Sequence, residues 1–424
     1  MTLARKFVKH VMSHTDYSIL RTDKIRQMSE KFYGLDGRSF LERHFYRYSH
    51  HPASGMPNFS ADSLKETTTE VGDIEIAERL LRYYKYVTSE PEYAAHAGHM
   101  WQDHEGTDHK FFLSCLEDGD SRALAGHLQN MSVRDVTQGL TQGAGYAEAL
   151  RGNSYIQTSL AYYIFDRLIC LAEALGCVPL ENPEQGRWDK NIYLTPAEVV
   201  KAIESELGFE IMPPQVEHGL FGLEIGGRVI GPRDIYSLHA AYRISRVLRR
   251  RTSASVCEIG AGLGKVAYWA NRFGLRDYTI FDLPYVSVLS AYFLLKSLPS
   301  SAVVLHGEPG ADTKGTIKIF PFWHLERMPK RHFDLVLNQD SMPEIEQTIV
   351  QDYLKTIKKV CSKYFLSINQ EGQAPLTAAG KPQLRVMELA RKEPGYEEVY
   401  RQKFWTREGY VEELFDISEK EFKP

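Results

Sequence analysis

The fold of this chain is indicated by the stretch Val256-Cys257-Glu258-Ile259-Gly260-Ala261-Gly262-Leu263-Gly264, in which an apolar run meets three glycines at alternate positions. A second apolar run, Tyr278-Thr279-Ile280-Phe281-Asp282-Leu283-Pro284, follows it and contains an acid near its end. A strand with a glycine turn after it, followed by a second strand that ends in an acid, is typical of a site for a nucleotide-type cofactor. The nature of that cofactor decides most of what the protein does.

Around this stretch, strand and helix signals alternate from about residue 215 onward, which is typical of a doubly wound, mostly parallel sheet with helices on both faces. The run from Thr316 to Pro321 also has the pattern of a strand, so the third core strand is either this run or 302–306. A hairpin is expected at 221–230, and antiparallel strands at 396–415 are expected to close the sheet. The other predicted strands are 254–259, 278–281, 333–337 and 364–369, and the predicted helices are 232–250, 264–273, 284–298 and 344–361.

The part before residue 190 has the pattern of helices, with apolar residues at helical spacing in 74–86 and 159–175. We therefore predict two domains. Residues 1–215 form a mostly helical N-terminal domain that acts as a cap over the acceptor or in oligomerisation. Residues 216–424 form a Rossmann-like domain that binds the cofactor.

Composition excludes several classes of protein. The chain has 424 residues and a formal net charge of −4, so it lacks the basic excess of nucleic-acid binders. Its five cysteines are odd in number and form no CxxC pair, which favours reduced thiols in the cytoplasm over disulfides or a zinc site. No apolar run is long enough to span a bilayer. The basic start, Met1 to Met12, is interpreted as an ordinary helix rather than a membrane-surface helix.

Three interpretations of the glycine stretch compete: a dinucleotide site, a site for S-adenosylmethionine, or no site. Glu258 lies two residues before Gly260, where a carboxylate would repel a pyrophosphate but suits a cofactor with a sulfonium and an ammonium group. The glycine spacing and the following Lys265 fit neither Gly-x-Gly-x-x-Gly nor a Walker loop. Asp282 is expected to accept ribose hydroxyls, with a helix N-cap as the alternative, and Leu283 to pack on the adenine.

These motifs together resemble the class I S-adenosylmethionine-dependent methyltransferases, over about residues 230 to 370. The run from Phe333 to Glu344 is similar to the Asn-x-x-Ser-x-x-Glu signature of the sugar O-methyltransferase family, here Asn338, Ser341 and Glu344. That family also carries a long helical N-terminal region, and the resemblance implies a sugar acceptor. The His-Asp-Trp run of plant phenol O-methyltransferases is missing from this chain, which argues against a phenol acceptor.

Methyl transfer to a hydroxyl needs a base at the carboxyl edge of the sheet, opposite the sulfonium. Asp340 and Glu344 are the candidate bases, and the alternative for Glu344 is a helix first-turn acid with Ser341 as its cap. Beside them we expect one residue that contacts the methionine end of the cofactor and three that contact the acceptor. The first is Asn338, and the others are Arg233, Tyr236 and Asn369.

Histidines are only minor candidates for the predicted site. His239 is expected to be a packed or exposed helix residue, and His306 and His324 are minor candidates for the base. No metal site is predicted. Oxygen ligands could come from Asp340, Glu344 and Glu371, but their spacing does not require an ion, and the histidine run at 96–109 lacks a metal-binding spacing.

The sequence therefore predicts a cytoplasmic O-methyltransferase that uses S-adenosylmethionine and a small-molecule acceptor, a sugar or a glycosylated metabolite. We expect no nucleic acid and no integral membrane contact, and leave a homo-oligomer open. The alternatives are O- or C-methylation of another small molecule, a non-catalytic binding protein on the same fold, and, disfavoured by Glu258 and the glycine spacing, an NAD-dependent oxidoreductase.

Overall fold

The computed structural model describes part of the chain, and all of the described residues lie within a compact unit that spans 55–424. The described residues are 59–60, 70–96, 107–137, 140, 150, 153–180, 194–214, 216, 221–310, 313–371 and 383–418.

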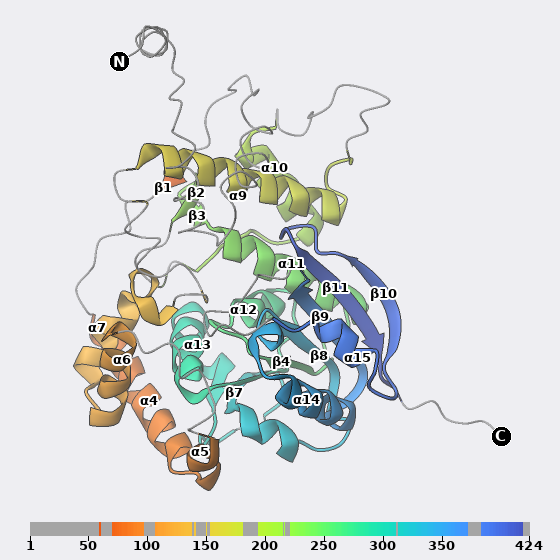
Figure 1. The fold of residues 1–424 in the computed structure, drawn as a ribbon. Coiled ribbons are helices and arrows are strands. Elements are labelled where there is room, and N and C mark those ends of the chain that lie inside the picture. Colours follow the sequence, from red (N-terminus) through yellow and green to blue (C-terminus); the bar gives the residue numbers. More distant parts are fainter. Residues whose placement is uncertain are drawn as a thin grey trace, which may run out of the picture. The chain divides into compact units, whose positions relative to one another are not determined.

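An eight-stranded sheet, in the order β10-β11-β9-β8-β4-β5-β7-β6, organises the second half of the chain (Figure 1). All neighbours from β9 to β6 are parallel, whereas β11 is antiparallel to β9 and β10 to β11. This confirms the Rossmann-like α/β class and the antiparallel closing strands. The strands are β4 (Val256–Ile259), β5 (Tyr278–Asp282), β6 (Val303–Leu305), β7 (Ile317–Pro321), β8 (Phe333–Gln339), β9 (Cys361–Gln370), β10 (Glu397–Lys403) and β11 (Tyr410–Asp416).

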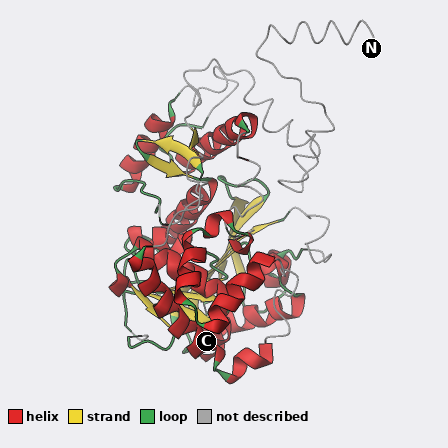
Figure 2. Cartoon of the chain, turned by 90° about the vertical axis from the view of Figure 1, so that its left-hand side faces the viewer, coloured by secondary structure: helices red, strands yellow, loops and turns green. Residues whose placement is uncertain are grey.

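Helices cover both faces of this sheet, as the pattern of buried side chains shows. Along β4, Val256 belongs to one apolar cluster, whereas Cys257 and Ile259 belong to the other, because successive side chains of a strand point to opposite faces. Figure 2 shows helices flanking the strands. The first cluster includes residues of α11 (Pro232–Val247), α12 (Lys265–Arg272) and α13 (Pro284–Ser297), and the second includes residues of α14 (Gln347–Val360) and α15 (Val386–Ala390).

The open question of the third core strand is answered by strand pairing. The run 317–321 is β7, which pairs with β5 along its whole length, from Tyr278 opposite Ile317 to Asp282 opposite Pro321. The run 303–305 is the short strand β6, which pairs only with β7 and lies at the edge. All five residues of β7 are buried, as a strand inside a covered parallel sheet requires.

The helix expected at 344–361 begins later than predicted. A 3₁₀ helix, η7 (Met342–Glu344), comes first, and α14 begins at Gln347. Glu344 therefore ends a separate short turn and is not a first-turn acid of α14. The hairpin at 221–230 is confirmed as β2 (Gly222–Ile225) and β3 (Arg228–Ile230), and β1 (Phe59–Ser60) joins it in a small separate sheet.

The first half of the described chain is mainly helical, as predicted. Its helices share the first apolar cluster with the large sheet, and α4 is fixed to α13 where Asp73 accepts hydrogen bonds from Tyr292 (2.9 Å) and Lys296 (2.6 Å). The division at residue 215 stays a prediction. None of the helices in the described ranges combines the length and apolarity needed to cross a membrane. The helices are α4 (Val71–Thr88), α5 (Pro91–His96), α6 (Thr107–Asp118), α7 (Ser121–Gln129), α9 (Ser154–Leu175) and α10 (Pro196–Leu207).

Candidate functional site

The carboxyl ends of the parallel strands meet at one edge of the sheet, and the chain reverses its winding direction between β4 and β8. From β4 the chain continues outward to β5, whereas β8 lies on the other side of β4. Ligands of doubly wound sheets bind in the crevice at such a switch point. The glycine stretch follows β4 directly, so it lies at this position.

The glycine loop has a backbone that only glycine adopts easily. Gly260, Gly262 and Gly264 all have positive φ, at 72°, 56° and 72°. A Cβ on Gly260 would lie 2.1 Å from the Oγ of Ser341, and one on Gly262 would lie 3.2 Å from Leu140. The loop therefore passes close to neighbouring groups, as a backbone that approaches a ligand must.

Asp282 binds this loop from the end of β5. Its Oδ2 accepts the backbone N–H of Gly262 (3.1 Å) and its Oδ1 that of Leu283 (2.8 Å). Burial raises the pKa of Asp282 to about 7, although backbone N–H donors oppose the shift. Leu283 is the N-cap residue of α13 by position, and the Asp282 carboxylate bonds its N–H. The predicted pair thus lies side by side at the switch point.

Glu258 lies inside the sheet and not on its open edge. It is only 1% exposed, its Oε2 accepts the hydroxyl hydrogen of Tyr278 at 2.8 Å, and burial raises its pKa to about 8. Lys265 also turns inward, where its ammonium pairs with Asp234 of α11 at 3.0 Å. The lysine that follows the glycine loop is therefore committed to fixing α11 and does not point at a phosphate.

Asn338 and Asn369 form a buried amide pair beneath the end of β8. The Nδ2 of Asn369 donates to the Oδ1 of Asn338 (3.0 Å), and Asn338 in turn donates to the carbonyl of Ile259 (2.9 Å) and to Ser341 (2.7 Å). The Oδ1 of Asn369 accepts the backbone N–H of Asp340 at 2.9 Å. Both amides thus hold the strand ends in place, and their predicted ligand contacts stay predictions.

Asp340 is held by three side chains from distant parts of the chain. Its carboxylate accepts hydrogen bonds from Arg233 of α11 (3.0 Å), from Arg407 and from the hydroxyl of Tyr410. Burial favours the neutral form, but the charges of Arg407 and Arg233 outweigh it and lower the pKa of Asp340. Its φ of 74° is left-handed, which aspartate tolerates better than most residues. Asp340 is therefore a clamped, ionised carboxylate.

Aromatic rings continue this cluster. The guanidinium carbon of Arg407 lies 3.7 Å from the ring centre of Tyr410 and 5.3 Å from that of Tyr236, and the Tyr236 hydroxyl bonds that of Tyr163 in α9. Arg233 thus bonds Asp340, and Tyr236 lies against Arg407, while the predicted contacts of both residues with the acceptor stay predictions. Arg407 lies in the hairpin turn between β10 and β11, and Tyr410 begins β11. Sequence reasoning missed both, because the only signal there was the polar Arg407-Glu408-Gly409 turn.

Glu344 lies four residues beyond Asp340 in the sequence and differs from it in its partners and in the direction of its pKa shift. Among the described residues, its carboxylate has no hydrogen-bond or ion-pair partner. Desolvation raises its pKa and the negative charge of Asp340 adds to the rise, while Arg233 and Arg407 oppose it. Glu371, the third carboxylate that could supply an oxygen ligand, pairs with Arg401.

Residues of the mainly helical first half of the chain reach the same edge. Leu140 lies against Gly262, and the ring of His109 in α6 packs edge-on against Tyr285 of α13, with ring centres 5.0 Å apart. His239 is packed as expected. It stacks on Phe404, and burial lowers its pKa to about 3. Two other histidines, His306 and His324, meet Glu90 at the far end of the edge. Most of the histidine run at 96–109 lies outside the described residues.

No protein-family model matches this chain, and no curated protein matches it significantly. Solved structures with a similar fold exist. A magnesium protoporphyrin IX methyltransferase from Synechocystis PCC 6803 with bound SAH is 8% identical and has a TM-score of 0.31, with 43% of this chain and 82% of that chain covered.

Two further structures are similar to the same extent. A SAM-dependent methyltransferase from Aquifex aeolicus is 8% identical, with a TM-score of 0.32 and coverage of 43% of this chain and 91% of that one. An S-adenosylmethionine-dependent methyltransferase from Mesorhizobium loti is 14% identical, with a TM-score of 0.27 and coverage of 42% and 97%. Likeness of this degree does not assign an activity.

Proposed function

We propose that this chain is an S-adenosylmethionine-dependent methyltransferase that transfers a methyl group to a hydroxyl of a small polar acceptor. The observation that carries the proposal is the left-handed glycine loop at the switch point, bonded to the buried Asp282 at the end of the next strand. The sugar, as acceptor, rests on the resemblance of Asn338, Ser341 and Glu344 to the sugar O-methyltransferase signature.

The residues at the loop fit this cofactor. Each oxygen of Asp282 accepts one backbone N–H, so each retains acceptor capacity for a ribose hydroxyl. Among the described residues, the inward Lys265 offers the glycine loop no cation for a pyrophosphate. Glu258 is buried inside the sheet, and its predicted contact with the cofactor stays a prediction. When bound, S-adenosylmethionine supplies an electrophilic methyl group, and the residues of this chain orient the acceptor and take its proton.

The cluster around Asp340 supports a polar acceptor. Arg233, Arg407 and Tyr410 supply hydrogen-bond donors, and Glu344 supplies an acceptor, which together suit a molecule with several hydroxyls. Leu140 and His109 cover the neighbouring edge, in keeping with a helical region that shields the reaction from water. This supports the predicted role of the N-terminal helices as a cap.

Between the two candidate bases, the geometry favours Glu344. Two arginines and a tyrosine already satisfy Asp340, and its lowered pKa makes it a weak base. Glu344 is unpaired among the described residues, and its raised pKa makes it a stronger base than an ordinary carboxylate. We therefore assign proton abstraction to Glu344 and the positioning of Arg233 and Arg407 to Asp340.

Calorimetry with S-adenosylhomocysteine tests the cofactor. We expect binding to the full chain, and we expect Asp282→Asn to weaken it about 10- to 100-fold, because asparagine has only one acceptor oxygen in place of the two that bond Gly262, Leu283 and the ribose. Asp352→Asn, at an exposed position on α14, is the control and should bind like the original protein. Tight binding of NAD with none of S-adenosylhomocysteine would overturn the proposal in favour of an oxidoreductase.

The acceptor is tested separately, with methyl-labelled cofactor and a panel of free sugars, glycosylated metabolites and non-sugar phenols and acids. Transfer to a sugar hydroxyl is the expected result. Transfer to a non-sugar molecule would correct the acceptor alone. A non-catalytic binding protein would be favoured by two results together. The protein would bind the cofactor without methylating any acceptor, and the double variant Asp340→Asn/Glu344→Gln would bind its partner as the original protein does.

A further inference from the structure

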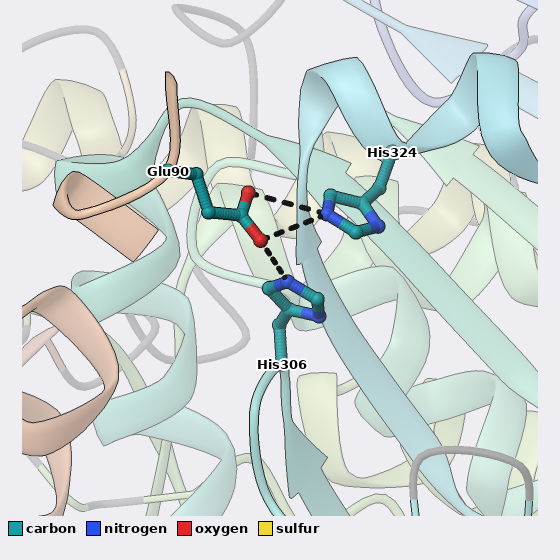
Figure 3. Close-up of side chains that lie close together, drawn as sticks. All are labelled: Glu90, His306 and His324. Carbon is teal, nitrogen blue, oxygen red and sulfur yellow. Dashed lines mark hydrogen bonds and ion pairs between the residues drawn. The ribbon is translucent and has the colours of Figure 1, made fainter. Parts of the chain in front are cut away.

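Glu90, His306 and His324 converge at the outer end of the carboxyl edge, where no metal was expected. Glu90 follows α4, His306 directly follows β6, and His324 belongs to the 3₁₀ helix η6 (Phe322–Arg327) after β7. The Glu90 carboxylate points between the two imidazole rings (Figure 3). Its Oε1 lies 2.8 Å from the Nε2 of His306 and 3.2 Å from the Nε2 of His324.

These distances are slightly shorter than those between ligands around a small ion. In a tetrahedral zinc site with bonds of about 2.0–2.2 Å, neighbouring ligand atoms lie about 3.3–3.6 Å apart. One ligand atom from each of the three residues lies within 4.8 Å of the others. The two Nε2 atoms that hydrogen-bond the carboxylate are the atoms that would bind the ion in place of their hydrogens, so only small ring movements are needed.

The surroundings hold the three groups in place. The indole Nε1 of Trp323 donates to the second carboxylate oxygen of Glu90 at 2.7 Å, which orients it as outer hydrogen bonds orient metal ligands. The ring of Phe320 packs against both histidines, with centres 5.1 and 5.7 Å away. All three side chains are between 11% and 15% exposed, so the cluster is sheltered but still reachable by an ion.

A cationic side chain lies beside this cluster. Arg327 lies 3.3 Å from His324, but it is half exposed, pairs with Glu92 and is able to turn away.

We propose that Glu90, His306 and His324 bind one Zn²⁺ ion, with the fourth position open to water. Two imidazoles and one carboxylate favour zinc over Mg²⁺ or Ca²⁺, which prefer oxygen ligands alone. The ion joins the end of α4 to the ends of β6 and β7, and so ties the helical half of the chain to the sheet. The site does not require any particular cofactor, and the proposal is therefore independent of the methyltransferase assignment.

The test uses the full chain, freed of metal with a chelator, incubated with ZnCl₂ and desalted. Elemental analysis should find one zinc equivalent per chain, and zinc should raise the melting temperature. Both effects should disappear in His306→Ala and His324→Ala. His332→Ala changes an exposed histidine next to β8 and is the matched control, which should keep both effects.

A variant that keeps all three ligands guards against misfolding as the explanation. Trp323→Phe keeps an aromatic ring but removes the hydrogen bond to Glu90, and should weaken zinc binding about 10- to 100-fold in competition with a chelating dye. Equal zinc content in folded His306→Ala and His324→Ala would overturn the proposal. So would a folded original protein that retains no zinc, which would leave a hydrogen-bonded cluster only.

Discussion

Two carboxylates on the same edge of the sheet, Asp340 and Glu90, are each held by side chains from distant parts of the chain, but their donors differ. Asp340 is bonded by two guanidinium groups and a phenol. Glu90 is bonded by two imidazoles and an indole. Both pKa values are lowered, in the first case by arginine charges and in the second mainly by hydrogen bonds.

The difference lies in the charge that remains. Arginines are charged at every accessible pH, so the cluster around Asp340 has its negative charge neutralised and its donors can turn to an acceptor molecule. Imidazoles carry no permanent charge, and a metal ion can replace the hydrogens with which they bond Glu90, so the cluster around Glu90 can accept a cation. Two clusters with similar hydrogen-bond counts are thus suited to opposite kinds of ligand.

The largest effect is expected from changing Glu344, the carboxylate beside Asp340 that has no partner among the described residues. Glu344→Gln should lower kcat about 100- to 10,000-fold, because a general base is lost. In the original protein, kcat should rise with pH as Glu344 loses its proton, with a midpoint above the ordinary glutamate pKa. Asp340→Asn should instead act mainly on the KM of the acceptor and leave that pH profile in place. A pH profile lost in Asp340→Asn and kept in Glu344→Gln would reverse the two roles.

An intermediate effect is expected from removing one arginine of the clamp. Arg407→Leu leaves Asp340 with Arg233 and Tyr410 only, and should lower the free energy of unfolding by about 2 kcal/mol, less than a fully buried pair would lose. Urea unfolding measures this change. Arg385→Leu removes an exposed pair with Glu388 and should cost under about 0.5 kcal/mol. Equal costs for the two variants would show that the clamp contributes no more than a surface ion pair.

The smallest effect is expected at Glu90 in metal-free protein. Glu90→Gln keeps a carbonyl oxygen for Trp323 and the histidines, so unfolding free energy at pH 7 should fall by only about 1 kcal/mol. The folded pKa of Glu90 is lowered, so its contribution is present above the unfolded pKa and is lost as pH falls through the folded value.

The difference in unfolding free energy between the original protein and Glu90→Gln should therefore shrink on acidification. Urea unfolding at pH 7 and near pH 4 measures it, with the exposed Glu388→Gln as control. A difference that stays constant or grows at low pH would contradict an ionised, hydrogen-bonded Glu90.

The sequence predicted the sheet and the glycine loop because both are local. Glycines at alternate positions after an apolar run set the turn, and an acid at the end of the next strand must lie beside it when the two strands pair in parallel. The choice between 302–306 and Thr316 to Pro321 could not be made in this way, because both runs have a strand pattern and only pairing with β5 separates them.

Contacts between side chains of distant elements could not be predicted from the sequence. Arg407 and Tyr410 meet Asp340 only because the β10–β11 hairpin folds beside β9, and Glu90 meets two histidines only because α4 ends at the edge strands. Neither contact has a spacing signature in the chain. His239 could be predicted, since a histidine on an apolar helix face is usually packed, and it is.

The packing of α13 limits how this protein can be divided. Nearly every side chain of this helix is buried, and Asp73 of α4 bonds both Tyr292 and Lys296 from outside it. A shortened chain that begins near residue 216 would expose an apolar helix to water and leave those two polar groups without their carboxylate. Such a fragment should aggregate on expression, so biochemical work and crystallisation are best attempted with the N-terminal helices retained.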